Sequence, residues 1–253
     1  TTFEELYALY QFDRDIRHIY LKYLLKVENT FKSVLAHEFS ALYGHDNYLK
    51  LENFDAVPDN ISSIIKLFGD IQQEMARQMS KHHQAVTHYL SEYGYIPLWV
   101  LVNVLTFGKV TMFYKLMKPQ DKQSIARKFH VDAKELHKYM SLCGLARNQC
   151  AHDERFFDLK FRWHLHTRSV ANFSCLGLER DKSGSYPSGT NDVYAIGIVF
   201  ARLLGTADTA EFIASMSAAF SKLEQQLHTI SIKDVMRIMG YPAAWERLQQ
   251  LAR

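Results

Sequence analysis

The spacing of apolar residues constrains the fold of this chain more than any other feature of its sequence. Before residue 160, apolar side chains recur at intervals of three and four, and glycine and proline are sparse. Such intervals put apolar side chains on one face of an α-helix, and few helix-breaking residues interrupt them. The sequence therefore predicts an all-α protein whose helices pack as a bundle.

The helical pattern divides into successive segments. Gly44 ends the first of them, and Pro97 and Pro119 open later ones. Asp132 begins the last, because it is a good N-cap residue and Glu135 follows three positions later, as in a capping box. The predicted helices cover residues 13–43, 60–93, 97–117 with a break near residue 108, a shorter stretch from 119, and a final stretch from 132.

The pattern changes beyond residue 156. Residues 161–166 alternate between apolar and polar side chains as a strand does, and residues 183–189 have the composition of a loop. We expect a small hairpin or irregular arm here. Its aromatic residues, Phe161 and Trp163, either stack on nucleic acid bases beside Arg162 and Arg168 or pack against the bundle. Additional C-terminal helices are predicted at 191–204, 209–227, 231–239 and 242–251.

No internal repeat, low-complexity tract or linker divides the chain. We therefore expect a single domain over residues 1–253. Within it, residues 1–158 form the core bundle, residues 159–190 form the arm, and residues 191–253 form the C-terminal helices.

Composition limits the class of protein. An apolar content of 47% is ample for a packed core and is unlike that of a disordered chain. The net charge of +3 is too small to indicate by itself that the protein binds nucleic acid. Three irregularly spaced cysteines fit a reduced protein, and no Cys-x-x-Cys pair is present to hold zinc. The cysteines thus favour a cytoplasmic protein. The first residues lack a signal-peptide pattern and the longest apolar run is too short to span a bilayer, so we expect no membrane partner.

Side chains with catalytic potential gather at residues 147–155. Asn148 and His152 are four residues apart, which puts them one turn apart on the same helix face. Arg147 lies about 140° round the helix from His152, and its long side chain can curl back or meet a second copy of the site. Arginine is a rigid fork of donors for phosphate, and histidine exchanges a proton near neutral pH. Together they suit RNA phosphodiester chemistry without a metal.

The spacing alone is weak evidence. With this many arginines and histidines, about two pairs at such spacings are expected by chance. Arg77 and His82 match the same spacing as Arg147 and His152. The surrounding residues separate the two matches.

Residues 147–155, Arg-Asn-Gln-Cys-Ala-His-Asp-Glu-Arg, resemble the RN-x-x-(A)-H-x-x-R signature of the Abi-like abortive-infection proteins (AbiD/AbiF type), members of the HEPN helical superfamily. Residues 10–17, followed by Val27 and Glu28, are similar to the family's first long helix. Three short blocks are similar to its HY…Y…PLWV…TFG pattern, namely residues 88–93, 97–100 and 105–108.

These blocks occur in the family's order and span residues 7 to 158. Beyond residue 160 the likeness thins out, although residues 239–245 look like the closing segment of Abi-like proteins. Asn103 departs from the pattern, because glutamate is expected at its position.

The resemblance implies a HEPN-like helical bundle and a ribonuclease toxin of a phage-defence or toxin–antitoxin system. Such enzymes cut RNA without a metal or other cofactor, since the ribose 2′-OH attacks the adjacent phosphate and leaves a cyclic phosphate. His152 is then the general acid or base, and Arg147 holds the phosphate and stabilises its developing charge. Asn148 orients the phosphate or His152, and Arg155 contacts a neighbouring phosphate. DNA lacks the 2′-OH and is expected to be inert.

One histidine cannot easily be both acid and base on opposite sides of one phosphate. Family members dimerise so that two motifs face each other across a two-fold axis. The resemblance therefore implies a symmetric homodimer with one composite cleft.

Residues of the first long helix have open roles. Arg14 and Lys22 either bind RNA phosphates or are simply solvated, and Arg17 is expected to bind RNA with them. Glu28 is either the acidic residue that the family places near the Arg/His site or a member of a structural ion pair.

The other histidines of the matched region have structural interpretations. His88 matches a family position and is expected to support the fold by hydrogen bonding. His82, His83 and His88 invite a zinc site, but adjacent helix positions diverge and no carboxylate or cysteine completes a ligand set. We expect no metal.

Two other interpretations of the motif stay open. A non-catalytic protein can use the same Arg/His cluster to bind a structured small non-coding RNA, which acts as an antitoxin or a guide. Alternatively, Arg147, His152 and Asp153 form a polar cap at a helix end. Loss of cleavage in His152→Ala with little loss of affinity distinguishes a nuclease from a binding protein.

Overall fold

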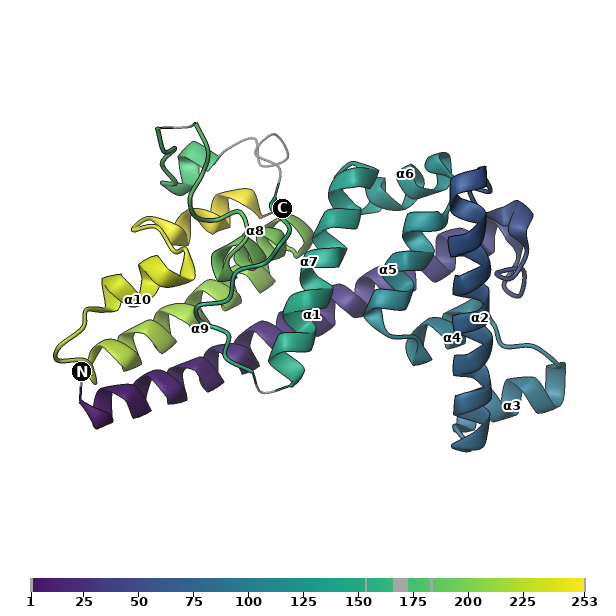
Figure 1. Ribbon diagram of the computed structural model, residues 1–253, viewed down its shortest axis with the longest axis horizontal. Helices are drawn as coiled ribbons and strands as arrows, with labels where there is room; N and C mark the ends of the chain where they lie inside the picture. Colours follow the sequence, from purple (N-terminus) through teal and green to yellow (C-terminus); the bar gives the residue numbers. More distant parts are fainter. Residues whose placement is uncertain (1, 153, 166–172, 183, 253) are drawn as a thin grey trace. The chain divides into compact units, whose positions relative to one another are not determined.

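The computed structural model describes residues 2–152, 154–165, 173–182 and 184–252. Over these ranges the protein consists of helices, loops and isolated β-bridges, and it contains no strand (Figure 1). The all-α prediction is confirmed. The chain forms two compact units: a terminal unit, Thr1–Val27 with Leu142–Arg253, and a central unit, Glu28–Ser141.

Two helices contribute to both units. α1 (Phe3–Tyr43) is 41 residues long, and α7 (Ala133–Ala151) carries the motif at its end. Asp132 accepts a hydrogen bond from the Glu135 amide at 2.8 Å, so the predicted cap of α7 is confirmed.

The prediction that the first helix starts near Asp13 is wrong, because α1 starts ten residues earlier. A reciprocal capping box forms this start. The Thr2 hydroxyl accepts from the Glu5 amide at 3.3 Å, and the Glu5 carboxylate accepts from the Thr2 amide at 2.9 Å. The apolar pattern hid this first segment because Phe3, Leu6, Tyr7 and Tyr10 are exposed.

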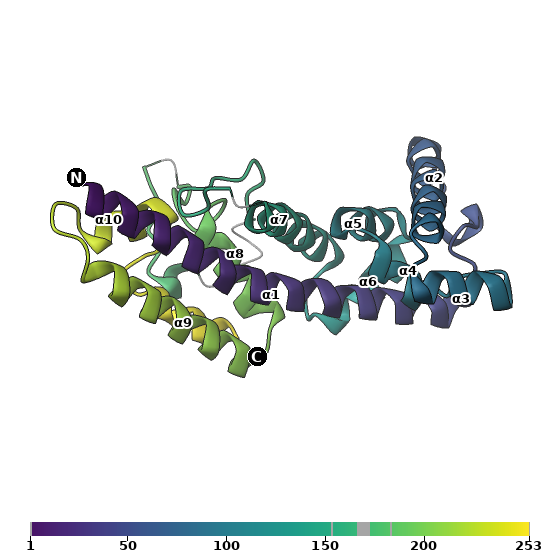
Figure 2. The same cartoon turned by 90° about the horizontal axis from the view of Figure 1, so that it is seen from below.

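The terminal unit is built around α8 (Val193–Leu203), whose residues Val193–Ala201 are all buried. A helix that is apolar all round has to lie in the middle of its core. α9 (Thr206–Glu224) runs antiparallel to the first half of α1 (Figures 1 and 2), and three ion pairs join these two helices. They are Lys22–Glu211 at 2.6 Å, Lys26–Asp208 at 2.6 Å and Lys222–Asp15 at 2.7 Å. α10 (Ile232–Met239) and two 3-10 helices, η2 (Phe173–Leu176) and η3 (Trp245–Leu251), complete the unit.

Tyr20 joins α1 to the C-terminal helices. Its hydroxyl donates to the carbonyl of Val193 at 3.1 Å and shares a hydrogen bond with the Tyr241 hydroxyl. Its ring meets Phe212 of α9 edge to face, with centroids 5.2 Å apart. Tyr20 is completely buried, and both its hydroxyl and its ring have partners inside this core.

The described part of the arm is irregular. Over the described residues 161–165 the predicted strand-like alternation is wrong, because the buried residues Phe161 and Leu165 are four apart, with the residues between them exposed. Both donate backbone hydrogen bonds to the segment before α8, to the carbonyls of Asn191 and Thr190. Trp163 is exposed. His166 and Arg168 lie outside the described residues.

In the central unit, helices pack around the second half of α1. They follow one another as η1 (Leu51–Asn53), α2 (Pro58–Ser80), α3 (Gln84–Tyr93), α4 (Leu98–Val104), α5 (Phe107–Leu116) and α6 (Pro119–Lys128). Phe39 of α1 meets Phe54 and Phe113 in its core, with ring centroids 5.8 and 5.0 Å apart. The break predicted near residue 108 falls between α4 and α5, where Thr106 caps α5.

A single helix over residues 60–93 was predicted, and this is wrong because the chain turns between α2 and α3. His82 adopts a left-handed conformation with φ of 51°, which a continuing helix does not allow. The His83 ring then accepts from the Val86 amide and caps α3.

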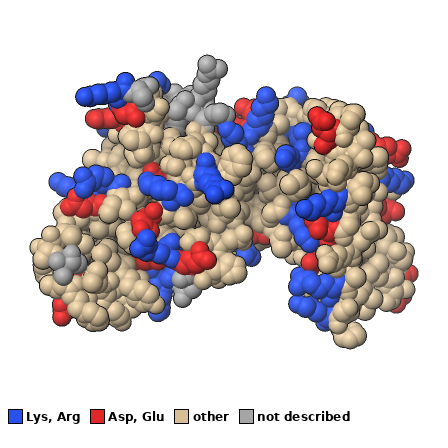
Figure 3. Space-filling view, in the orientation of Figure 1, with Lys and Arg blue, Asp and Glu red and all other residues tan. Residues whose placement is uncertain are grey.

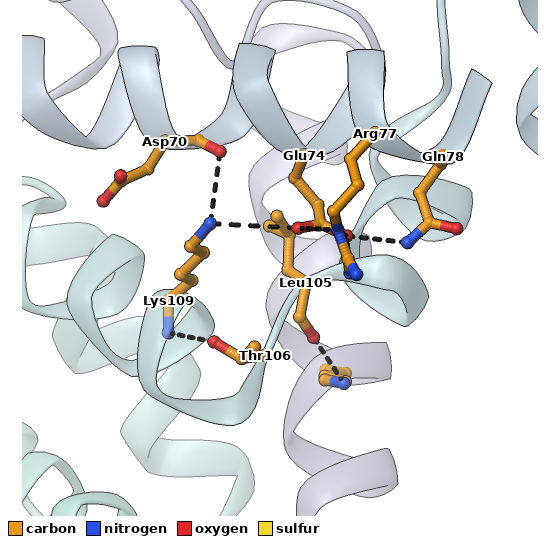
Figure 4. A network of polar contacts seen from close by, with 8 residues as sticks. Asp70, Glu74, Arg77, Gln78, Leu105, Thr106 and Lys109 are labelled. Carbon is orange, nitrogen blue, oxygen red and sulfur yellow. Dashed lines mark hydrogen bonds and ion pairs between the residues drawn. The ribbon is translucent and has the colours of Figure 1, made fainter. Parts of the chain in front are cut away.

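A buried carboxylate on α2 holds a polar network (Figure 4). Glu74 accepts from the guanidinium of Arg77 and from the amide of Gln78, at 2.5 and 2.7 Å. Lys109 of α5 donates to the carbonyl of Asp70 at 3.3 Å and lies 3.9 Å from the other oxygen of Glu74. This network joins α2 to α5 beside their apolar contact.

The predicted C-terminal helices belong to the same unit as the start of α1, because Tyr20 and the ion pairs of α9 bring them together.

Replacing Gly240 tests a close approach in the terminal unit. Gly240 has a φ of +86°, and an added Cβ would lie 2.1 Å from the Asp192 carboxylate. That carboxylate is buried and accepts from the Gly189 and Ala195 amides. We expect Gly240→Ala to lower the free energy of unfolding by more than the roughly 1–2 kcal/mol of left-handed strain alone.

Gly94→Ala is the matched control. Gly94 has a φ of +75° with open space around an added Cβ, so only the strain applies. Urea unfolding followed by circular dichroism measures both variants. Equal losses for the two would contradict the close approach at Gly240.

Glu5 makes stability depend on pH. Hydrogen bonds from the Thr229 hydroxyl and from backbone amides hold the pKa of its carboxyl well below the usual 4.5. A carboxyl whose pKa is lowered on folding stabilises the protein above its unfolded pKa and loses that contribution as pH falls. Glu5→Gln should therefore be less stable than wild type at pH 7, with the difference shrinking below about pH 4.5. Thermal unfolding from pH 3 to 7 measures this, and Glu92→Gln, at an exposed position of α3, is the control.

Candidate functional site

The motif residues lie at the end of α7, in the terminal unit. Asn148 is exposed in the last turn of the helix, and exposed His152 follows directly after its end. The His152 amide donates to the Asn148 carbonyl at 3.1 Å, so these two residues lie one turn apart, as predicted. Asp153 lies outside the described residues.

Arg147 lies partly inside the protein. Its side chain is half-buried, and its Nε atom is shielded from solvent. Leu145 is 45% exposed, and it lies on the helix face of Asn148 and His152, three and seven residues before them. The exposed face therefore combines an amide and an imidazole with one apolar side chain.

The cysteines of α7 are buried in its opposite face. Burial raises the pKa of the Cys150 thiol to about 12, and it raises that of Cys143 further. Both stay protonated near neutral pH, and a thiol is a poor nucleophile compared with a thiolate. Of these three side chains, the exposed imidazole of His152, and neither thiol, is therefore suited to exchange a proton with solvent.

Asp13 of α1 holds the backbone that follows the motif. One of its carboxylate oxygens accepts from the Phe156 and Phe157 amides at 2.9 and 2.7 Å. Its other oxygen forms an ion pair with Arg17 at 3.2 Å. Sequence reasoning missed Asp13, although an acid beside the apolar stripe residue Phe12 and four residues before Arg17 is a recognisable signal.

The cations of α1 do not share one environment. Arg14 is exposed, one residue from Asp13. Arg17 is only 4% exposed, so its geometry favours support of the Asp13 carboxylate over direct contact with RNA. Lys22 is exposed, but it pairs with Glu211 of α9.

Arg155 extends the motif beyond the helix. Its side chain is exposed and pairs with Asp158 at 2.7 Å, and its carbonyl accepts from the Gln149 side chain at 3.2 Å. A cavity of about 320 Å³ lies beside it. The residues that line this cavity include Arg155, Asp13, Arg17, Tyr10 and Phe157, so the structure brings Arg155 to the Asp13–Arg17 pair.

The two supporting residues predicted outside the motif belong to the central unit. Glu28 is buried and pairs with Lys32 at 2.7 Å, which is the structural ion pair expected as one of its two roles. His88 is exposed on α3 and contacts the rings of Tyr89 and Tyr93. The expected hydrogen bond of its side chain is not found among the described residues, so His88 contributes ring contacts instead.

The chance match to the motif has a structural explanation. Arg77 is bound by Glu74 through two guanidinium nitrogens (Figure 4). His82 lies in the turn after α2. These two residues serve the network and the turn of the central unit.

Charge is mixed over the surface. On the face in Figure 3, lysine and arginine lie among aspartate and glutamate, in line with the net charge of +3. Within the ranges described, no three His, Cys, Asp or Glu residues form a potential metal site. No helix in those ranges has the length and apolarity needed to cross a membrane.

A family model described as Abi-like protein matches residues 1–158. The chain belongs to the Abi-like protein family. No curated protein and no solved structure matches it. Membership associates this Abi-like protein with abortive infection, a defence against phage. The matched region contains α1 to α7 with the whole motif, whereas α8 to α10 lie beyond it.

Asp13→Ala tests the buried support of the Abi-like motif. It removes a carboxylate that accepts two amides and pairs with buried Arg17, and breaking such a buried pair costs about 3–5 kcal/mol. We also expect faster amide hydrogen exchange at Phe156 and Phe157.

Asp15→Ala is the control on the same helix. Asp15 pairs with Lys222 in solvent, and such pairs contribute about 0–1 kcal/mol. Unfolding and hydrogen exchange are compared for both variants. If Asp13→Ala changes neither more than Asp15→Ala does, the proposed support is refuted.

Proposed function

We propose that this Abi-like protein is a phage-defence endoribonuclease that acts in the cytoplasm and cuts RNA without a metal. The observation that carries the proposal is the exposure of Asn148 and His152 one turn apart, with Arg147 beside them and Arg155 a few residues on. An accessible imidazole is suited to proton transfer at a phosphodiester, and the arginines of the same motif are suited to hold its phosphate.

The proposed reaction uses only the substrate's own hydroxyl as nucleophile. The ribose 2′-OH loses its proton to an imidazole, and its oxygen forms a bond to phosphorus. The bond from phosphorus to the 5′ oxygen breaks, and that oxygen takes up a proton. The products are a 2′,3′-cyclic phosphate and a 5′-hydroxyl. His152 transfers a proton, Arg147 stabilises the charged phosphorane, and Asn148 orients the phosphate or the imidazole.

A second copy of the chain completes the proposed site. One imidazole serves one side of the phosphorus, so the other proton transfer requires the partner's motif. Leu145 lies on the same helix face, two turns before His152, and a contact between two facing motifs would cover it.

We propose that a small non-coding RNA regulates the activity of the protein. An RNA that binds the Arg/His cluster without being cut would occupy the site as an antitoxin. The alternative function is that the protein binds such an RNA and cuts none. Comparison of His152→Ala with wild type distinguishes a nuclease from an RNA-binding protein.

His152→Ala should reduce cleavage of a single-stranded RNA by about 10²–10⁴-fold, the range for loss of a general acid or base. RNA affinity should change by only a few-fold. His228→Ala, which removes another exposed histidine of the terminal unit, should leave cleavage unchanged. Arg147→Ala should weaken both binding and cleavage.

Cleavage is measured on gels with end-labelled RNA, and a 2′-O-methyl strand of the same sequence shows whether the 2′-OH is needed. Cleavage of the methylated strand, or unchanged cleavage by His152→Ala, would refute the mechanism. Tight binding of RNA by wild type with no cleavage would favour the binding protein.

Leu145→Glu tests the composite site. A charge on this face should convert the dimer to monomer in analytical ultracentrifugation and abolish cleavage, with unchanged thermal stability of the monomer. Ile238→Glu is the matched control, because Ile238 is also 45% exposed and lies in the same unit on α10. Full cleavage by a monomeric Leu145→Glu chain would contradict the composite site.

A further inference from the structure

The central unit carries a continuous series of aromatic rings, which we call the aromatic track. Successive ring centroids lie 5.7 Å apart from Tyr89 to Tyr93, 6.3 Å from there to Tyr95, 5.1 Å to His45 and 5.5 Å to Trp99. His88 flanks its first two members. None of these rings is buried, and Tyr93 and Trp99 are 58% and 48% exposed.

The backbone fixes the track although its rings come from α3, from α4 and from the segments that follow α1 and α3. Gly94 ends α3 in a left-handed conformation with φ of 75°, which turns the chain from Tyr93 to Tyr95. The His45 carbonyl accepts from the Leu98 amide at 2.8 Å, which joins the end of α1 to the start of α4. A hydrogen bond of 2.9 Å also links the His45 ring to the Tyr95 hydroxyl.

A cavity of about 500 Å³ begins at the Trp99 end of the track. Small residues of α1, such as Ala36 and Ser40, leave this space open, and His37 and Asn103 line it with polar groups. Asn103 is held by a hydrogen bond from its side chain to the Trp99 carbonyl at 2.8 Å. No carboxylate lines the cavity.

This combination fits an unpaired nucleobase better than an apolar protein segment. A volume of about 500 Å³ lies within the range of small-ligand pockets. Trp99 offers a π-face for stacking, and His37 and Asn103 offer donors and acceptors for a base edge. An apolar helix would need an aliphatic lining, but apart from Val102 and alanines this lining is aromatic or polar.

We propose that the aromatic track and its cavity bind unpaired bases of single-stranded RNA, as a second contact surface besides the motif. The choice of RNA rests on the proposed function. Successive bases stack on aromatic side chains with little sequence preference, and a duplex cannot present its bases in this way. The track would therefore direct the protein to unpaired RNA.

The test compares two substitutions at one ring. Both are made in the His152→Ala chain, so that the RNA stays intact. Trp99→Leu keeps an apolar side chain but removes the π-face, whereas Trp99→Phe keeps a ring. We expect Trp99→Leu to bind a fluorescein-labelled 12-nucleotide single strand about tenfold more weakly, and Trp99→Phe to stay within about threefold of the parent.

Three further variants complete the set. Tyr93→Leu should weaken binding as Trp99→Leu does, because it removes the other strongly exposed ring. Asn103→Glu should also weaken it, because it places a negative charge in the cavity. Ile65→Ala is the control, since Ile65 is 54% exposed in the same unit and carries no ring. Fluorescence anisotropy gives each affinity, and a blunt duplex of the same strand should show no dependence on residue 99.

Weakening by Trp99→Leu, Tyr93→Leu and Asn103→Glu, with retention by Trp99→Phe and Ile65→Ala, supports the proposal. Equal affinities of Trp99→Leu and parent overturn it, and so does an equal loss for the duplex. If AMP alone binds as tightly as the strand and Trp99→Leu abolishes that binding, the site holds a free nucleotide and the proposal fails.

The proposed nuclease activity is tested separately, by cleavage with the chain that retains His152. If that chain cleaves RNA and Trp99→Leu does not change binding, only the proposal for the aromatic track is refuted. If binding depends on Trp99 but no RNA is cleaved, only the proposed nuclease activity is refuted.

Discussion

The carboxylate of Asp13 is the constraint on which the motif segment depends. A buried negative charge is costly unless hydrogen bonds and an opposite charge surround it. Asp13 has both, from the Phe156 and Phe157 amides and from Arg17. The chain that leaves α7 after His152 is thereby fixed to α1, and Arg155 lies on this fixed stretch. The proposed chemistry needs such fixed positions, because catalytic side chains act from a defined geometry.

Local chemistry made part of the fold predictable. Asp132 with Glu135, and Pro119 at a helix start, act within one turn, and α7 and α6 begin where these residues predict. Asn148 and His152 share a face for the same reason, since helix geometry alone relates residues four apart.

Predictions failed where the apolar pattern gives no signal of a turn or of a buried partner. The apolar spacing of residues 60–93 predicts one helix. In the structure, the left-handed conformation of His82 and the cap formed by His83 divide this segment into α2 and α3. Arg17 has the sequence pattern of a surface cation, but Asp13 and the neighbouring core draw it inside. The alternation at 161–165 has no sheet to join, so hydrogen bonds to Asn191 and Thr190 replace strand pairing.

The packing around Tyr20 has a practical consequence for expression. The family match ends at residue 158, but the buried face of α1 is covered by Val193, Phe212 and Tyr241 from beyond that point. In a fragment that ends at residue 158, this aromatic face would be exposed to solvent, and we expect such a fragment to aggregate through it. The described residues after 158 therefore contribute to the core of the terminal unit, and a fragment chosen for crystallisation should include them.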